Sequence, residues 1–148
     1  MSDAANVMLH LKVAANRESL EDFARWQHAC LKEREKKKRP LLLQHVTRLM
    51  PKRRHEILDG GSIYWIIKGR IVARQKIVGL KPVKRSGQSD FAITYEPKLI
   101  LVAPRRTQQI EGWRYLAAKD APPDIAANKA AKALPEDLRA ELSELGLL

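Results

Sequence analysis

The stretch that decides the fold is Leu58-Asp59-Gly60-Gly61-Ser62-Ile63-Tyr64-Trp65-Ile66-Ile67-Lys68-Gly69. Residues 62–68 are rich in aromatic and β-branched side chains without polar alternation, which predicts an inner strand buried on both faces. The glycine pair at 60–61 predicts the end of a preceding helix and a turn. Lys68-Gly69 predicts a tight turn into a second strand over 70–80. The stretch therefore indicates a helix, a buried strand and a hairpin in direct succession.

The flanking sequence predicts further helices and strands. Alternation predicts a strand over 8–13, and Ser19 with Asp22 three residues later predicts the start of a long helix. The basic run 36–39 and Pro40 predict its end. We expect a strand over 41–49 and a short helix over 52–58 with Pro51 at its first position. Later strands are expected over 91–95, 99–102 and 112–116, with a polar loop over 84–90 and a loop over 104–109.

These elements predict an α+β fold. We expect a small, mostly antiparallel sheet, curled or closed into a half-open barrel, with one long N-terminal helix, a short inserted helix and a C-terminal helix. Residues 1–116 are expected to form a single domain, and residues 117–134 a linker. The last segment, 135–148, opens at Pro135 and carries Leu138, Leu142 and Leu145 on one stripe before Gly146. This helix is expected either to dock on the domain or to serve as a tail that binds a protein partner.

The charge of the chain is unevenly distributed. The 148 residues carry a formal net charge of +11. Residues 32–54 hold ten Lys or Arg and two Glu, whereas residues 120–148 hold six acids and three bases. This pattern favours one electropositive surface and a polyanionic partner, above all nucleic acid. The single cysteine, Cys30, excludes an intrachain disulfide. No secretory signal or membrane-spanning stretch is visible, so the prediction is a cytoplasmic protein with no membrane partner.

A cationic cluster precedes the glycine pair, and four like charges in seven residues repel one another. A phosphate held by the arginine forks and the start of the short helix would relieve that repulsion. The cluster consists of Arg48, Lys52, Arg53 and Arg54. The alternative is a solvated helix face that Glu56 and Asp59 partly neutralise. Four more cations follow on the predicted hairpin and extend the groove to eight: Lys68, Arg70, Arg74 and Lys76. Their alternative role is protection of a sheet edge, which is favoured for Lys76.

Aromatic residues are interleaved with this charge at two places. Tyr64 and Trp65 are neighbours on one strand, and Trp113 and Tyr115 flank Arg114 on another. One member of each pair is predicted to stack a base, Tyr64 in the first pair and either aromatic in the second. Arg114 is predicted to add a phosphate or cation–π contact. The alternative is that these aromatics are part of the core.

The sequence gives little support for catalysis. The four histidines have no metal-ligand spacing with Cys30 or with one another, so no metal site is expected. The glycines lack the spacing of a nucleotide-binding loop, and no cofactor is expected. The weak catalytic candidates are His45, His55 and Glu56, which suggest as an alternative a small enzyme acting on a phosphate-bearing substrate. The sequence favours a protein that is not an enzyme.

A resemblance covers nearly the whole chain. The segments that carry it are Leu58–Gly69 with Ala73-Arg74-Gln75, His45–Arg48 with Pro51–Arg53, Gly112–Leu116, and Leu134–Leu142 with Leu145-Gly146. On these segments the chain resembles a bacterial family catalogued as domain of unknown function 1489, which implies no particular activity. A weaker resemblance, at the level of the fold, is to the PUA-like barrels, including the ASCH and EVE groups. Several of those bind RNA or modified bases, which implies RNA rather than DNA as the partner.

The functional hypothesis is a nucleic-acid-binding module that is not an enzyme. Phosphates would be held by the cations of the cluster and the hairpin and by Arg114, whereas Tyr64, Trp113 or Tyr115 would contact a base. The two alternatives are the small enzyme and an adaptor that binds a protein through its C-terminal helix.

Overall fold

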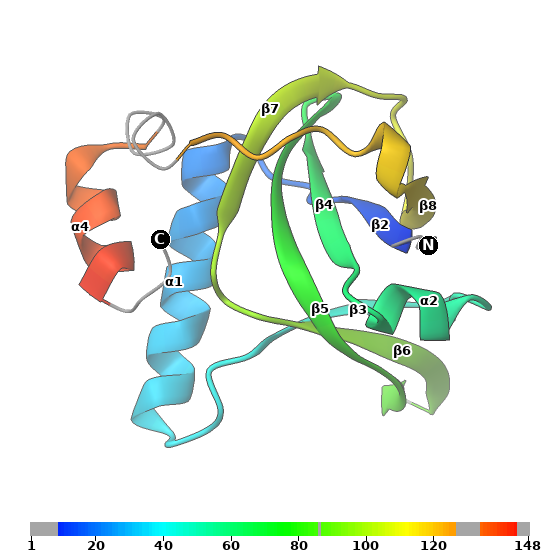
Figure 1. The fold of residues 1–148 in the computed structure, drawn as a ribbon. Coiled ribbons are helices and arrows are strands. Elements are labelled where there is room, and N and C mark those ends of the chain that lie inside the picture. Colours follow the sequence, from blue (N-terminus) through cyan, green and yellow to red (C-terminus); the bar gives the residue numbers. More distant parts are fainter. Residues whose placement is uncertain (1–8, 86, 127–133, 145–148) are drawn as a thin grey trace.

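The computed structural model describes residues 9–85, 87–126 and 134–144. Figure 1 shows the arrangement of the elements. In chain order the elements are β2 (Leu9–Ala14), α1 (Leu20–Lys36), β3 (Leu43–Thr47), α2 (Arg54–Leu58), β4 (Ser62–Ile67), β5 (Arg70–Arg85), β6 (Gln88–Tyr95), β7 (Ile100–Arg106), β8 (Trp113–Ala117), the 3-10 turn η1 (Ala118–Asp120) and α4 (Glu136–Glu144). The predicted α+β class is confirmed.

The seven strands of the described residues form one open sheet. Its order is β3-β6-β5-β4-β2-β8, and β7 pairs with the first part of β5. β2 and β4 are parallel, and the other pairs are antiparallel. Register shifts within β5 pairings bend this long strand, which curves together with β6 and β7 in Figure 1. β3 and β8 form the two edges, so the sheet does not close into a barrel.

The central strand β4 lies where the sequence predicted it. All six of its residues are buried, because both faces of the sheet are covered. Lys68 and Gly69 both have positive φ, +52° and +75°, as the predicted tight hairpin turn requires. Gly61 donates its backbone N–H to the Ile57 carbonyl at 2.7 Å. A Cβ atom at this position would collide with the carbonyl oxygens of Leu9 and Ile57, so only glycine fits between α2 and β2.

Helix α1 covers the inner face of the sheet, which is the face that holds the main core. Ser19 caps the helix as predicted, its Oγ accepting the Asp22 N–H at 3.0 Å. Phe23 and Leu31 are buried, and the Phe23 ring lies 5.0 Å from the Trp65 ring, centroid to centroid. One apolar face of the helix therefore packs against the centre of β4.

A polar network is buried between α1 and the sheet. The side-chain amides of Gln27 and Gln75 pair with each other at 2.9 and 2.8 Å. The Gln75 oxygen also accepts the Trp65 Nε1–H at 2.8 Å, and its nitrogen donates to the Pro97 carbonyl at 3.1 Å. Gln27 also donates to the Tyr95 hydroxyl at 3.2 Å. Every amide group in this network has a partner, and together they fix the position of α1 over the strands.

The outer face of the sheet carries a second, smaller core. Its buried residues are Tyr64, Ile66, Ile71, Val102 and Leu116. The segment that follows β8 crosses this face, as the orange strip in Figure 1 shows, and its backbone forms hydrogen bonds with β7. Ala103 donates its N–H to Pro123, and Ile125 donates to Leu101, at 2.8 and 2.9 Å. The first part of the segment expected as a linker thus packs on the sheet; residues 127–133 lie outside the described residues.

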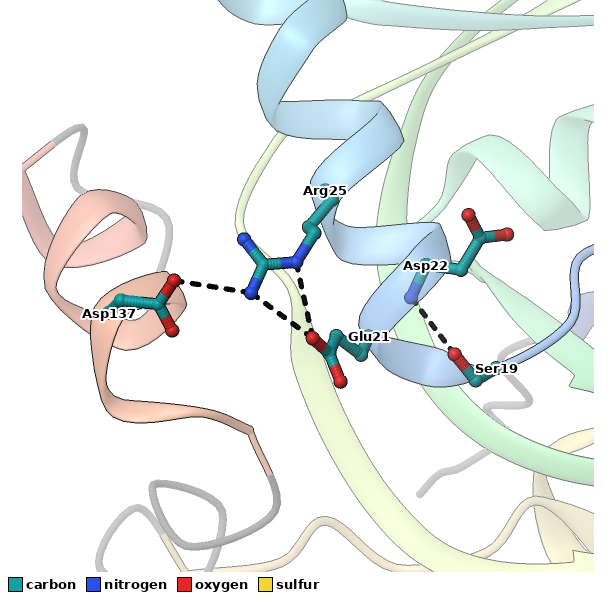
Figure 2. A network of polar contacts seen from close by, with 5 residues as sticks. All are labelled: Ser19, Glu21, Asp22, Arg25 and Asp137. Carbon is teal, nitrogen blue, oxygen red and sulfur yellow. Dashed lines mark hydrogen bonds and ion pairs between the residues drawn. The ribbon is translucent and has the colours of Figure 1, made fainter.

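Helix α4 lies beside α1 (Figure 1). Leu138 has no exposed surface and belongs to the main core, as does Leu134. Figure 2 shows Arg25 of α1 between Glu21 and Asp137, with N–O distances of 3.1 and 3.2 Å. Leu138 therefore lacks the exposed surface on which the adaptor alternative depends. The Leu142 side chain, Leu145 and Gly146 lie outside the described residues.

Three predicted boundaries are wrong. Pro51 is not the first residue of the short helix, because a turn at 52–53 intervenes and α2 begins at Arg54. The polar stretch 84–90 is mostly strand, since Arg85 pairs with Gln88 across a turn containing Gly87 at φ +78°. The loop expected from residue 104 begins after Arg106, because β7 continues alongside β5. The expected strand start at Met8 and residue 86 lie outside the described residues.

Candidate nucleic-acid interface

The cationic cluster lies on one surface, at the end of the sheet where β4 begins. We call the side chains of Arg48, Lys52, Arg53 and Arg54 the α2 surface; all four are exposed. They occupy the loop after β3 and the first turn of α2, and the neighbouring Leu49 is 71% exposed. Ile57, on the opposite side of α2, is fully buried. The amphipathic helix therefore anchors the cationic residues to the core.

Two aromatic residues of β8 hold this loop in place. Trp113 donates its Nε1–H to the Leu49 carbonyl at 2.8 Å, and the Arg53 backbone N–H donates to the Tyr115 hydroxyl at 3.1 Å. The two rings pack edge to face with centroids 5.0 Å apart. The structure thus brings together the charged and the aromatic segments that the sequence singled out. Both aromatics are half-buried and use their polar atoms to position the loop.

Arg53 is engaged within the protein. Its guanidinium forms two hydrogen bonds of 2.7 Å with Glu56. Its Cζ atom also lies 5.6 Å from the centre of the Tyr115 ring. The hydrogen bond from Arg53 lowers the pKa of the Glu56 carboxyl group, and the same bond raises the pKa of Arg53. In the described part of the chain, Arg48, Lys52 and Arg54 form no ion pair, so these three cations remain available to an external anion.

Three of the four hairpin cations, Lys68, Arg70 and Arg74, do not extend this surface. Lys68 and Arg70 lie at the opposite end of β4 from α2, and Lys68 pairs with Glu18 at 3.1 Å. Arg70 is exposed and lies opposite Arg106 of β7. Arg74 forms two hydrogen bonds of 2.8 Å with Asp124. Lys76 is exposed and lies opposite Ser62, but the edge protection expected of it is wrong, because β5 is paired on both sides at this point. The predicted groove of eight cations is therefore wrong.

Tyr64 does not offer a face to a base. It is 5% exposed, beneath residues 117–125, and its ring lies edge to face with that of His10 at 4.9 Å. Burial raises the pKa of its hydroxyl group. The predicted stacking role of Tyr64 is wrong, because alternation along β4 indicates which residues share a face but not that a later segment covers it.

Arg114 is exposed on β8, on the face opposite Trp113 and Tyr115. Its guanidinium donates to the carbonyls of Glu111 and Trp113 at 3.1 and 2.7 Å. It lies directly opposite Lys12 of β2, a residue that the sequence did not single out. The only available signal for Lys12 was its polar place in an alternating apolar strand.

The histidine candidates do not form a catalytic group. His45 is half-buried with its ring 5.6 Å from that of Trp65, and burial lowers its pKa. His55 is exposed on α2, and the Glu56 carboxylate is bound to Arg53. A pocket of about 230 Å³ lies at the far end of β4, and neither histidine lines it. Among the described residues, no group of His, Cys, Asp or Glu is arranged to hold a metal ion.

His10 is the histidine that sequence reasoning missed. It is 5% exposed, and its Nδ1 accepts the Ser62 N–H at 2.9 Å. Burial, and secondarily the positive charge of Arg74, lowers the pKa of His10 to about 4. Its neutral ring joins β2 to β4 on the outer face, so its role is structural.

Comparison with known proteins identifies the family. The chain belongs to the family described as "Protein of unknown function (DUF1489)", whose model matches residues 10–148, and the resemblance seen in the sequence is thereby confirmed. No curated protein and no solved structure matches the chain, and the expected likeness to PUA-like barrels is not confirmed. None of the helices in the described residues is long and apolar enough to cross a membrane.

Proposed function

We propose that this member of the DUF1489 family binds single-stranded nucleic acid through the α2 surface. The observation that carries the proposal is that three exposed cations, which form no ion pair with any described residue, lie on the loop and first turn of α2 that Trp113 and Tyr115 hold in place. A cationic site that is already positioned loses little conformational freedom when it binds phosphates. These contacts position a strand without reading its sequence.

The shape of the surface favours a single strand over a duplex. α2 has five residues, a length of about 7–8 Å, too short to lie in a major groove as a recognition helix. The strongly exposed Leu49 stands among the cations and gives an unstacked base an apolar contact. A single strand presents both phosphates and open base faces to such a surface. We expect RNA to bind at least as well as DNA of the same sequence.

Arg53 has a supporting role in this proposal. Its bonds to Glu56 and its position over Tyr115 connect α2 to β8. Arg48, Lys52 and Arg54 extend from that framework into solvent. The α2 surface thus has a fixed base and three side chains that can each contact a phosphate.

The test is a fluorescence-anisotropy titration of a single-stranded RNA, the matching DNA strand and the duplex over a series of salt concentrations. The triple variant Arg48→Gln, Lys52→Gln, Arg54→Gln removes the three cations. Because each phosphate contact contributes roughly 0.7 to the slope of log affinity against log salt, the slope should fall by about two.

The matched control is Lys32→Gln, Lys36→Gln, Arg39→Gln, which removes the same charge from exposed positions around the end of α1. This control variant should keep most of the affinity for RNA and most of the dependence of log affinity on log salt. Equal losses in the two triple variants, or no binding of the unaltered protein at low salt, would exclude the α2 surface as a specific site.

A further inference from the structure

Two like charges lie directly opposite each other on the outer face of the sheet. Lys12 of β2 pairs in register with Arg114 of β8. Both side chains lie on the outer face, because Leu11 and Val13 on one strand and Trp113 and Tyr115 on the other pack against the main core. Like charges at directly opposite positions destabilise an antiparallel pair. This pair is therefore unfavourable in the free protein.

No carboxylate offsets this repulsion within the described residues. The half-buried Lys12 donates from its ammonium to the Thr107 hydroxyl at 2.9 Å, and Arg114 donates only to backbone carbonyls. Glu111 and Asp120 are nearby in the chain and exposed, and neither forms an ion pair with these cations. The contrast is Arg74 on the same sheet, which Asp124 neutralises with two bonds. Within the described part of the chain, the fold thus supplies an acid for Arg74 and none for Lys12 and Arg114.

Arg105 of β7 is a third cation on the outer face of the sheet. Arg105 lies opposite Ile71, a residue of the outer core, and its guanidinium donates to the Asp120 carbonyl at 2.7 Å. Thr107, two residues later, receives the Lys12 ammonium and donates its own N–H to the Gly69 carbonyl at 3.0 Å. Thr107 therefore connects the end of β7 with the Lys12 side chain.

We propose that Lys12, Arg105 and Arg114, here called the outer cluster, form a second anion-binding surface whose ligand carries phosphate groups. Guanidinium and ammonium groups bonded only to neutral acceptors still attract an anion, and a phosphate between Lys12 and Arg114 relieves their repulsion. The phosphate can belong to a small phosphorylated molecule or to a strand held at the α2 surface. β8 connects the two surfaces, because Trp113 and Tyr115 lie on one of its faces and Arg114 on the other. The binding of phosphate itself does not depend on the function proposed above.

The experiment is an NMR titration of the ¹⁵N-labelled protein with inorganic pyrophosphate. Saturable shifts are expected at the backbone amides of Thr107 and Arg114. Lys12→Met and Arg114→Gln should each weaken binding about tenfold, the loss expected for one charge-assisted hydrogen bond. Arg114→Gln retains the bond between Lys12 and Thr107, so it tests the charge without removing that contact. Lys32→Met, at an exposed position on α1, is the control and should bind pyrophosphate as the unaltered protein does.

A second titration with single-stranded RNA distinguishes the sources of the phosphate. If RNA shifts the amide signals of both Arg53 and Thr107, one strand reaches both surfaces. If RNA shifts the amide signal of Arg53 but not that of Thr107, and pyrophosphate still binds at Thr107, the outer cluster binds a separate phosphorylated ligand. Amides of Thr107 and Arg114 that do not respond to pyrophosphate, or an equal loss in Lys32→Met, overturn the proposal. RNA that shifts neither region while pyrophosphate binds refutes the α2 surface and leaves the outer cluster standing.

Discussion

His10 couples the stability of the outer face to pH. Its Nδ1 atom must be unprotonated to accept the Ser62 N–H, so the neutral ring carries its proton on Nε2. Burial and Arg74 both disfavour the charged ring, and its pKa falls from 6.5 to about 4. The unfolded chain therefore binds a proton at His10 between pH 6.5 and 4, whereas the folded chain does not.

Stability should fall as the pH drops through that window. A shift of this size corresponds to about 3 kcal/mol of unfolding free energy, present above pH 6.5 and lost by pH 4. The lowered pKa of His45 acts in the same direction. Paired carboxylates such as Asp124 lose their contribution at lower pH, because their pKa values are reduced from an already acidic value. Urea unfolding at several pH values between 7 and 4 measures the effect.

His10→Asn supplies an oxygen near the place of Nδ1 and removes the titrating group, so it should flatten the decline. His55→Asn, at an exposed position on α2, is the matched substitution. An unchanged pH dependence in His10→Asn would show that other groups cause the acid sensitivity.

Single residues were predictable where their partners are close in sequence. The Ser19 cap bonds a residue three positions away, and the Lys68-Gly69 turn depends on two adjacent φ angles. The burial of Tyr64 was not predictable in this way, because residues 117–125, far away in the sequence, cover it. The same is true of Arg74, whose acid partner Asp124 is fifty positions away. A sequence shows that a position is charged but not that a distant carboxylate neutralises it.

At the scale of elements, the described side chains of α4 that hold it to the molecule are the buried Leu138 and the exposed Asp137, which is part of an ion-pair network. Leu138 contributes apolar burial in the main core, whereas Arg25 and Asp137 meet at the surface (Figure 2). Buried apolar area stabilises far more than exposed ion pairs, which are screened by solvent.

Leu138→Ala should therefore cost about 2–5 kcal/mol of unfolding free energy, from the lost burial and the cavity left behind. Arg25→Ala should cost less than about 1 kcal/mol. Urea unfolding of the two variants, with hydrogen exchange of the α4 amides, measures the difference. An Arg25→Ala variant as unstable as Leu138→Ala would mean that the ion pairs, rather than the core, hold the helix.

The elements that the sequence placed best are those with one strong periodic pattern. α1 and β4 agree closely with prediction, since one packs by a single stripe and the other is buried on both faces. The sequence predicts loops at the polar ends of β5, β6 and β7, because solvated strand ends lack an apolar pattern. Their pairing, such as that of Lys84 with Ser89, is visible only in three dimensions.

At the scale of the whole molecule, the positively charged side chains outnumber the carboxylates that could neutralise them. The net charge is +11, and the ion pairs of the described residues are mostly exposed. The sequence predicted the fold class and the separate charged and aromatic segments of the α2 surface. It did not predict the parallel pairing of β2 with β4 or the second pairing of β5 with β7. Both join segments whose proximity no local pattern encodes.

Stability should rise with salt, because chloride solutions screen the repulsion among excess cations. We expect the melting temperature to increase by about 2–4 °C between low and physiological ionic strength, the shift that roughly 1 kcal/mol produces in a chain of this size. The triple variant Arg48→Gln, Lys52→Gln, Arg54→Gln lowers the net charge from +11 to +8 and should respond less. A melting temperature that falls with salt would show that attractive ion pairs, among them Arg74–Asp124, outweigh the repulsion.

The position of β2 between β4 and β8 has a consequence for biosynthesis. Leu11 pairs with Ile63 on one side and with Tyr115 on the other, so both neighbours of this strand are translated long after it. A nascent chain that stops before residue 113 leaves one hydrogen-bonding edge of an apolar strand open, and open edges pair readily with other chains. The ribosome must therefore deliver nearly the whole sheet before both edges of its first described strand are paired.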